Sequence, residues 1–102
     1  MKIRYERSGG FTGMSVKVNL DTNSLPPETT QSFYQALATA RFFDLPEKLD
    51  APAGSADQFT HRLTIDDEER HHAVEMPDSA VPDALQPFLR RLVLMARKPD
   101  AQ

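Results

Sequence analysis

The sequence contains no cysteine among its 102 residues. Disulfide frameworks, thiolate nucleophiles and zinc sites with cysteine ligands are therefore excluded. Positive charge is also scarce, because 12 basic residues against 15 acidic ones give a net charge of −3. The basic residues are scattered along the chain rather than clustered, which argues against a nucleic-acid partner.

Long hydrophobic runs are absent as well. The longest mainly apolar stretch, residues 88–96, is interrupted by Arg90 and Arg91, and it is far shorter than the roughly 20 residues of a membrane-spanning helix. The first residues alternate polar and apolar and lack the apolar core of a signal peptide. We therefore expect a cytoplasmic protein without a membrane partner, unless a non-classical route exports it.

The composition that is present, 39% hydrophobic and 26% charged residues, is typical of a globular protein. A chain of this length has room for one hydrophobic core. We predict a single domain over residues 1–102, with a frayed tail at residues 98–102.

Two segments near the N-terminus alternate in the manner of half-buried strands. In residues 2–7 the apolar set is Ile3 and Tyr5, and residues 14–21 place Met14, Val16, Val18 and Leu20 on one face. Three of the four glycines lie between these segments, in residues 8–13. Because glycine adopts positive φ at little cost, the pattern predicts a β-hairpin with a long glycine-rich tip.

Helical periodicity appears twice in the sequence. The first predicted helix opens at residues 25–28 and runs to about Phe42; its buried stripe is Phe33, Ala36, Leu37 and Ala40. The second runs from about Asp83 to Arg97, and Pro87 requires either a start near Pro87 after a short turn at residues 82–86 or a bend. Its apolar stripe is Leu85, Phe88, Leu89, Leu92, Met95 and Ala96.

A second hairpin is predicted between the helices, after a long loop at residues 47–57. Its strands lie near residues 58–65 and 70–76, and the acidic run at residues 66–69 turns the chain. The inward faces are Phe59, His61, Leu63 and Ile65 on the first strand and His72, Val74 and Met76 on the second. The order ββαββα predicts an α+β fold, a four-stranded antiparallel sheet with both helices on its apolar face.

The three histidines do not have the arrangement of a metal site. His71 and His72 are neighbours on a strand and leave opposite faces, whereas zinc needs three or four converging ligands. We therefore expect one semi-buried histidine, with the remaining histidines solvated. The acidic run lacks the calcium-loop pattern, and no nucleophile-elbow spacing is present. The sequence predicts no metal, no cofactor and no catalytic residue.

The glycine-rich tip carries one aromatic ring, Phe11, which the simplest strand pairing leaves outside the core. One interpretation is that Phe11 folds back over the sheet edge as a small satellite of the core. The other is that the ring stays outside and binds a partner. The residues alone leave both interpretations open.

Residues 2–13 resemble the start of emfourin proteins, which are inhibitors of protealysin-like members of the thermolysin family. The likeness continues through residues 25–28, the Phe-Phe-Asp-Leu-Pro run at residues 42–46, residues 57–59 and residues 85–89. It therefore covers nearly the whole chain in order. One departure is the acidic turn at residues 66–69, which has no glycine where family members often have one.

The resemblance implies a protein inhibitor that blocks the active-site cleft of a protealysin-like or thermolysin-like zinc metalloprotease and binds no metal itself. We expect such an inhibitor to be a monomer when free. The predicted protease-binding residues are those of the hairpin tip: Ser8, Gly9, Gly10, Phe11, Thr12 and Gly13. Thermolysin-like enzymes favour a bulky apolar side chain just after the scissile bond, so Phe11 is the predicted anchor.

Two other functions stay open at this point. A binding module could dock an unrelated protein on its polar sheet face, which carries Arg4, Lys17, Thr60 and Arg62. A small enzyme could instead use His61 or His72. For the inhibitor, the loop at residues 47–57 and the turn at residues 66–69 are the two candidates for a second contact loop beside the tip.

Overall fold

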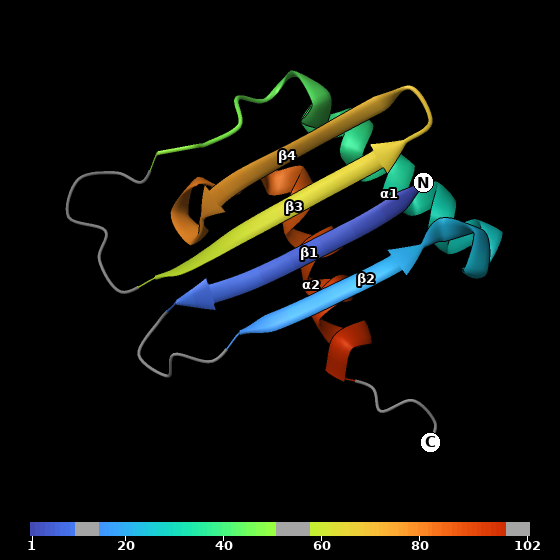
Figure 1. Cartoon of the computed structure of the whole chain (residues 1–102), viewed down its shortest axis with the longest axis horizontal. Helices are drawn as coiled ribbons and strands as arrows, with labels where there is room; N and C mark the ends of the chain where they lie inside the picture. Colours follow the sequence, from blue (N-terminus) through green and yellow to red (C-terminus); the bar gives the residue numbers. More distant parts are fainter. Residues whose placement is uncertain (10–14, 51–57, 98–102) are drawn as a thin grey trace.

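The computed structural model describes residues 1–9, 15–50 and 58–97. Within them lie four strands, β1 (Lys2–Gly9), β2 (Val16–Asp21), β3 (Phe59–Asp67) and β4 (Arg70–Pro77), and two helices, α1 (Pro27–Ala40) and α2 (Gln86–Arg97). Short 3-10 turns, η1 (Thr22–Ser24), η2 (Phe42–Asp44), η3 (Asp78–Ala80) and η4 (Asp83–Leu85), connect them. The order ββαββα is the predicted one (Figure 1).

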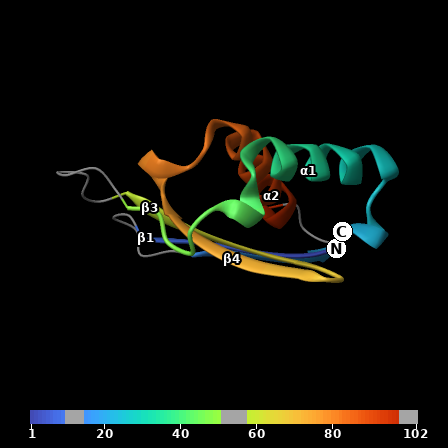
Figure 2. The same cartoon turned by 90° about the horizontal axis from the view of Figure 1, so that it is seen from above.

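The four strands form one antiparallel sheet with the order β2-β1-β3-β4. β1 is therefore a central strand that pairs with β2 on one side and with β3 on the other. Both helices cover the same face of the sheet (Figure 2), so the predicted α+β class is confirmed.

The core lies between the sheet and the two helices. Ile3 and Tyr5 of β1 are buried, as are Phe33 of α1 and Phe88 of α2, whose ring centres are 4.7 Å apart. The predicted alternation in β3 and β4 is also confirmed, because Leu63, Ile65, Val74 and Met76 have no exposed surface. Burial of these apolar side chains is the main stabilising contribution to such a two-layer fold.

The first helix ends two residues before its predicted end. Arg41 takes a left-handed conformation with φ of 54°, and its N–H donates to the carbonyl oxygens of Leu37 and Ala38. This left-handed residue closes α1 at Ala40 and redirects the chain. Phe42 consequently starts the separate turn η2, where its side chain is fully buried.

The second helix begins at Gln86, directly after η4. Pro87 therefore lies in the first turn of α2, where the missing N–H has no helical partner to lose. Of the two alternatives for Pro87, the start after a short turn is confirmed. Phe88, Leu89 and Leu92 bury the predicted apolar stripe.

The strands of the second hairpin are longer than predicted. Asp66 pairs with His71 and Asp67 with Arg70, so the two aspartates belong to β3 and the reversal is made by Glu68 and Glu69 alone. Glu68 has φ of 43°. A glutamate thus occupies a left-handed position that glycine adopts with less strain.

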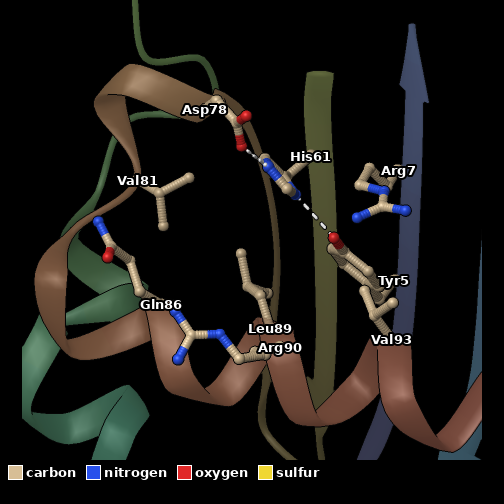
Figure 3. A pocket seen from close by; sticks show the side chains of 9 residues that line it. All are labelled: Tyr5, Arg7, His61, Asp78, Val81, Gln86, Leu89, Arg90 and Val93. Carbon is tan, nitrogen blue, oxygen red and sulfur yellow. Dashed lines mark hydrogen bonds and ion pairs between the residues drawn. The ribbon is translucent and has the colours of Figure 1, made fainter. Parts of the chain in front are cut away.

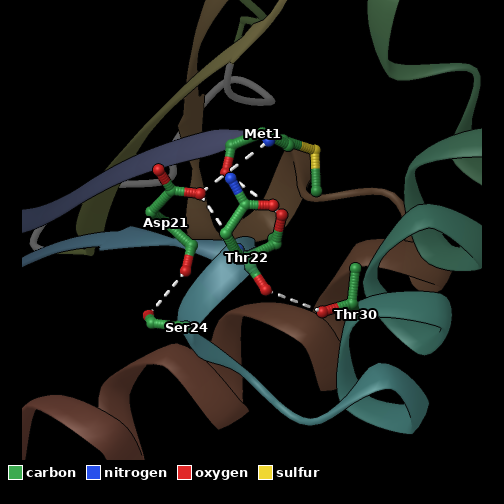
Figure 4. A network of polar contacts seen from close by, with 6 residues as sticks. Met1, Asp21, Thr22, Ser24 and Thr30 are labelled. Atoms are coloured by element: carbon green, nitrogen blue, oxygen red, sulfur yellow. Dashed lines mark hydrogen bonds and ion pairs between the residues drawn. The ribbon is translucent and has the colours of Figure 1, made fainter.

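The N-terminal residue is fastened to the segment that follows β2 (Figure 4). The backbone N–H of Thr22 donates to the carbonyl oxygen of Met1 at 2.9 Å, and the Thr22 hydroxyl donates to the same oxygen at 3.2 Å. The carbonyl of Thr22 in turn accepts from the hydroxyl of Thr30 in α1 at 3.1 Å. These bonds hold the start of α1 at this end of the sheet.

Candidate functional site

β1 extends two residues further than β2 at the end of the sheet where the predicted tip begins. Arg7 pairs with Val16 of β2, and beyond that point, among the described residues, Ser8 and Gly9 pair with Thr60 and Phe59 of β3. Two of the six predicted protease-binding residues are therefore part of a paired strand rather than of a loop. The other four, Gly10, Phe11, Thr12 and Gly13, lie outside the described residues, as does Met14.

Gly9 occupies a position that a larger residue would strain. Its φ is 97°, and a Cβ atom added there would lie 3.3 Å from the carbonyl oxygen of Gln58. Both observations favour glycine, because L-residues rarely adopt this φ and the contact would be tighter than usual. The sequence analysis predicted that glycines here allow positive φ, and Gly9 is the described position where this occurs.

The described neighbours of Gly9 bear on the two candidates for a second contact loop. β3 begins with Phe59 opposite Gly9, so Gln58, the residue that follows the long loop, lies next to Gly9. The acidic turn follows Asp67, whereas Lys2 at the start of β1 pairs with Asp66, which places that turn at the opposite end (Figure 1). Of the two candidate loops, the acidic turn is therefore far from Gly9, whereas Gln58, the first described residue after the other candidate, is beside it.

The other described residues of the long loop cover an edge of the sheet. The N–H of Leu49 donates to the carbonyl oxygen of Glu75 at 2.9 Å. The N–H of Glu75 donates in turn to the carbonyl oxygen of Glu47 at 2.8 Å. This segment pairs with the outer edge of β4 around a parallel bridge between Lys48 and Glu75. It therefore occupies the backbone groups of Glu75 on that edge, which another strand could otherwise pair with.

An arginine and an aromatic ring lie on the helix-side face of the same strand end. Arg7 follows Ile3 and Tyr5 in the alternation of β1, and its guanidinium carbon is 4.4 Å from the centre of the Phe59 ring. Such contacts stabilise both groups, because the ring face attracts the cation. Figure 2 shows that this end of the sheet projects beyond the helices. Sequence reasoning did not single out Arg7, although its odd position in β1 was the available signal.

Three polar side chains form a chain of hydrogen bonds beside Arg7 (Figure 3). The Tyr5 hydroxyl is 2.7 Å from Nδ1 of His61, and Nε2 of His61 is 2.5 Å from Oδ1 of Asp78. The Asp78 carboxylate only accepts, so Nε2 carries a proton and donates it. In the neutral imidazole Nδ1 then accepts from Tyr5. These two hydrogen bonds link β1, β3 and η3.

The electrostatics of this chain fit a structural role. Burial raises the pKa of the Tyr5 hydroxyl to about 12; the Arg7 charge opposes the rise and the Asp78 charge adds to it. A tyrosine that acts as a nucleophile or base needs a lowered pKa instead. The bonds therefore fasten η3 to the sheet and satisfy a buried histidine, which is 7% exposed.

The histidines are more covered than the sequence predicted. His61 is buried as expected, but His72 is half-buried too, with Nε2 donating to the carbonyl oxygen of Leu45 at 2.7 Å and its ring against Phe42. The strand alternation predicted the inward position of His72, but not these partners, because η2 comes from a distant part of the chain. His71 is exposed on the opposite face, as predicted. Within the described ranges, no three His, Asp or Glu side chains gather as a metal site.

A cavity of about 330 Å³ opens next to the hydrogen-bonded chain, between β1, β3 and α2 (Figure 3). Its polar walls include Tyr5, Arg7, His61, Asp78 and Arg90, and its apolar walls are Val81, Leu89 and Val93. Arg7 lies two residues before Gly9 on the same strand. The cavity is therefore a neighbour of the predicted contact segment.

Comparison with protein families identifies the chain. The Emfourin family model matches residues 5–93, which is most of the sequence. The chain belongs to the Emfourin family. It is a family of protease inhibitors, and membership implies a metallopeptidase as the general kind of partner. No curated protein and no solved structure gives a significant match.

In this Emfourin chain the polar sheet face has mixed charge. Lys17 and Glu6 are 3.8 Å apart on neighbouring strands, His71 faces Asp66 at 3.8 Å, and Arg4 donates to the side-chain oxygen of Asn19 at 3.2 Å. Because the opposite charges alternate, this face presents no field of one sign to a partner.

No helix in the described part of the chain is long and apolar enough to span a bilayer.

Proposed function

We propose that the chain inhibits a thermolysin-like, protealysin-like zinc metalloprotease by placing the glycine-rich end of the β1–β2 hairpin in its active-site cleft. Membership of the Emfourin family carries the inhibitory part of this proposal. Cytoplasmic localisation and a monomeric free state stay predictions from the sequence.

The strand pairing around Gly9 supports the choice of the hairpin end. Ser8 and Gly9 are held by β3, and the preceding residues of β1 are held by strands on both sides. A segment that is anchored in this way has less conformational entropy to lose on docking than a free peptide. The absent side chain of Gly9 also lets a partner approach the backbone closely.

Phe11 is the proposed anchor of the contact. An apolar ring that fills a pocket at the centre of an interface is the typical hot spot of protein recognition. The ring would occupy the enzyme subsite that receives the residue just after the scissile bond.

The test is a titration of a purified thermolysin-like protease with this protein while cleavage of a peptide is followed. We expect stoichiometric inhibition by the wild-type chain. Phe11→Ala should raise the inhibition constant by about 30-fold, the equivalent of about 2 kcal/mol. The control is Lys2→Ala, since Lys2 is exposed at the start of β1, at the opposite end of that strand from Gly9.

Two results would contradict the proposal. Full cleavage in the presence of a molar excess of the chain would overturn the inhibitory role. An unchanged constant for Phe11→Ala, with inhibition retained, would move the contact away from the hairpin. A loss of inhibition in Arg62→Gln would then assign it to the polar sheet face.

A further inference from the structure

The half-buried side chain of Arg7 has an unusual environment at its Nε atom. Alternation in β1 directs this side chain to the helix-side face, where Ile3 and Tyr5 are core residues. Its Nε atom is buried and makes no hydrogen bond, and within residues 1–9, 15–50 and 58–97 no carboxylate forms an ion pair with it. An unpaired buried donor on a charged group is costly, and native proteins seldom leave one without an acceptor.

A second arginine lines the same cavity from the helix. Arg90 is exposed on α2 and has neither a hydrogen bond nor an ion pair with any described residue. Its neighbour Arg91 differs, because it donates to the Ser32 hydroxyl at 3.0 Å and lies over the Phe33 ring. Two guanidiniums thus line one cavity of about 330 Å³.

The negative charge in the cavity is already engaged. Asp78 is the one carboxylate among the lining residues, and it accepts a hydrogen bond from His61. The first turn of α2, which lines the cavity through Gln86, contains no acidic side chain. The positive end of a helix dipole also favours an anion at this place. The walls therefore carry a surplus of one positive charge with neutral His61.

We propose that this cavity receives the side chain of an aspartate or glutamate of the partner peptidase. The carboxylate would accept hydrogen bonds from Arg7 and Arg90, and the methylene groups would contact Val81 and Leu89. Planar guanidiniums bind carboxylates through two parallel hydrogen bonds, which suits such an occupant. The inference rests on the proposed function, because the cavity adjoins the strand end that carries Gly9.

One experiment tests the site on the free protein. N-acetylglutamate N-methylamide is titrated into the ¹⁵N-labelled chain while the Arg7 Nε–H and the ring resonances of Tyr5 and His61 are followed by NMR. We expect a saturable shift of these resonances. The glutamine analogue, which lacks the charge, should produce none, and Arg7→Gln should abolish the shift of the Tyr5 and His61 rings.

A second experiment tests the site in the complex. Arg7→Gln and Arg90→Gln should each raise the inhibition constant by about 10-fold or more, because each leaves a desolvated carboxylate of the peptidase with one donor fewer. Both variants should also show a weaker dependence of the constant on salt. Arg62→Gln is the matched control, since Arg62 is exposed on the other face, and it should stay within about 2-fold.

Arg7→Gln also removes the contact with the Phe59 ring and could lower the stability of the fold. Arg90→Gln tests the site without this effect, because Arg90 is exposed. The inference is overturned if the glutamate probe does not shift the resonances, while the wild-type chain inhibits the peptidase and Phe11→Ala weakens that inhibition. It is equally overturned if both arginine variants inhibit like the wild type. Binding of the glutamate probe without inhibition by any form would instead overturn the proposed function, and with it the peptidase as occupant.

Discussion

The backbone of Gly9 approaches that of Gln58 so closely that a Cβ atom on Gly9 would lie 3.3 Å from the Gln58 carbonyl oxygen. These two residues flank the two segments at the same end of the sheet, the predicted hairpin tip and the long loop. A change at Gly9 should therefore affect both stability and inhibition.

Gly9→Ala should lower the free energy of unfolding by about 2 kcal/mol, because alanine is strained at φ of 97° and its methyl group meets Gln58. Urea denaturation measures this loss. Ser8→Ala is the control, since Ser8 is an exposed neighbour in the same strand, and it should change stability by less than about 0.5 kcal/mol. Equal stability of the two variants would show that the backbone accommodates a side chain at Gly9.

Tyr5→Phe should destabilise the fold by about 2 kcal/mol at neutral pH, because it leaves the buried Nδ1 of His61 without its partner. Thermal unfolding measures the effect. Tyr34→Phe provides the comparison, as Tyr34 is 40% exposed and should lose much less. A Tyr5→Phe variant as stable as the wild type would mean that water replaces the hydroxyl.

The stability of the wild-type chain should fall between pH 10 and pH 12. The tyrosine ionises near 10 in the unfolded chain, whereas burial raises the pKa of folded Tyr5 to about 12. The unfolded state therefore loses its proton first, and the free energy of unfolding decreases as the pH rises through this range. At about 1.4 kcal/mol per pH unit, the decrease approaches 3 kcal/mol.

Tyr5→Phe should lack this part of the alkaline decrease. Burial and the nearby carboxylates also raise the pKa of Tyr34, but both proteins contain that residue, so its contribution cancels in the comparison. Denaturation of both proteins at several pH values measures the difference. Parallel curves up to pH 12 would contradict the assignment of the shift to Tyr5.

Glu68→Gly should stabilise the chain by about 1 kcal/mol, because Glu68 holds φ of 43° in the tight turn between β3 and β4. The gain is the relief of left-handed strain less the greater backbone entropy of unfolded glycine. Chemical denaturation measures it, and Glu69→Gly in the same turn, without positive φ, should instead destabilise. This turn lies at the far end from Gly9, so the inhibition constant should not change.

The hairpins were predictable because strand alternation is local. Ile3 and Tyr5 are buried while Lys2 and Arg4 are exposed, as their spacing indicates. The end of α1 was not predictable in the same way. Arg41 is a residue that favours helices, and its left-handed conformation goes with the burial of Phe42 in the core.

The candidate site likewise has features that the sequence predicted and features that depend on the tertiary structure. The glycines of the tip were visible as sequence, and so was the likeness to the Emfourin family. The position of Gln58 beside Gly9 was not, because the pairing of β1 with β3 joins residues about fifty positions apart. The cavity with Arg7 and Arg90 likewise depends on where α2 crosses the sheet.

The amino-acid sequence by itself determined the element order, the α+β class, the inward faces of the strands and the family, because each follows from local periodicity or from motifs read in order. Only the tertiary structure decided the strand order β2-β1-β3-β4, the hydrogen bond from His72 to Leu45 and the bonds from Tyr5 through His61 to Asp78. These features bring together residues that are distant in the chain, and such contacts are selected by packing of the whole core rather than by any local preference.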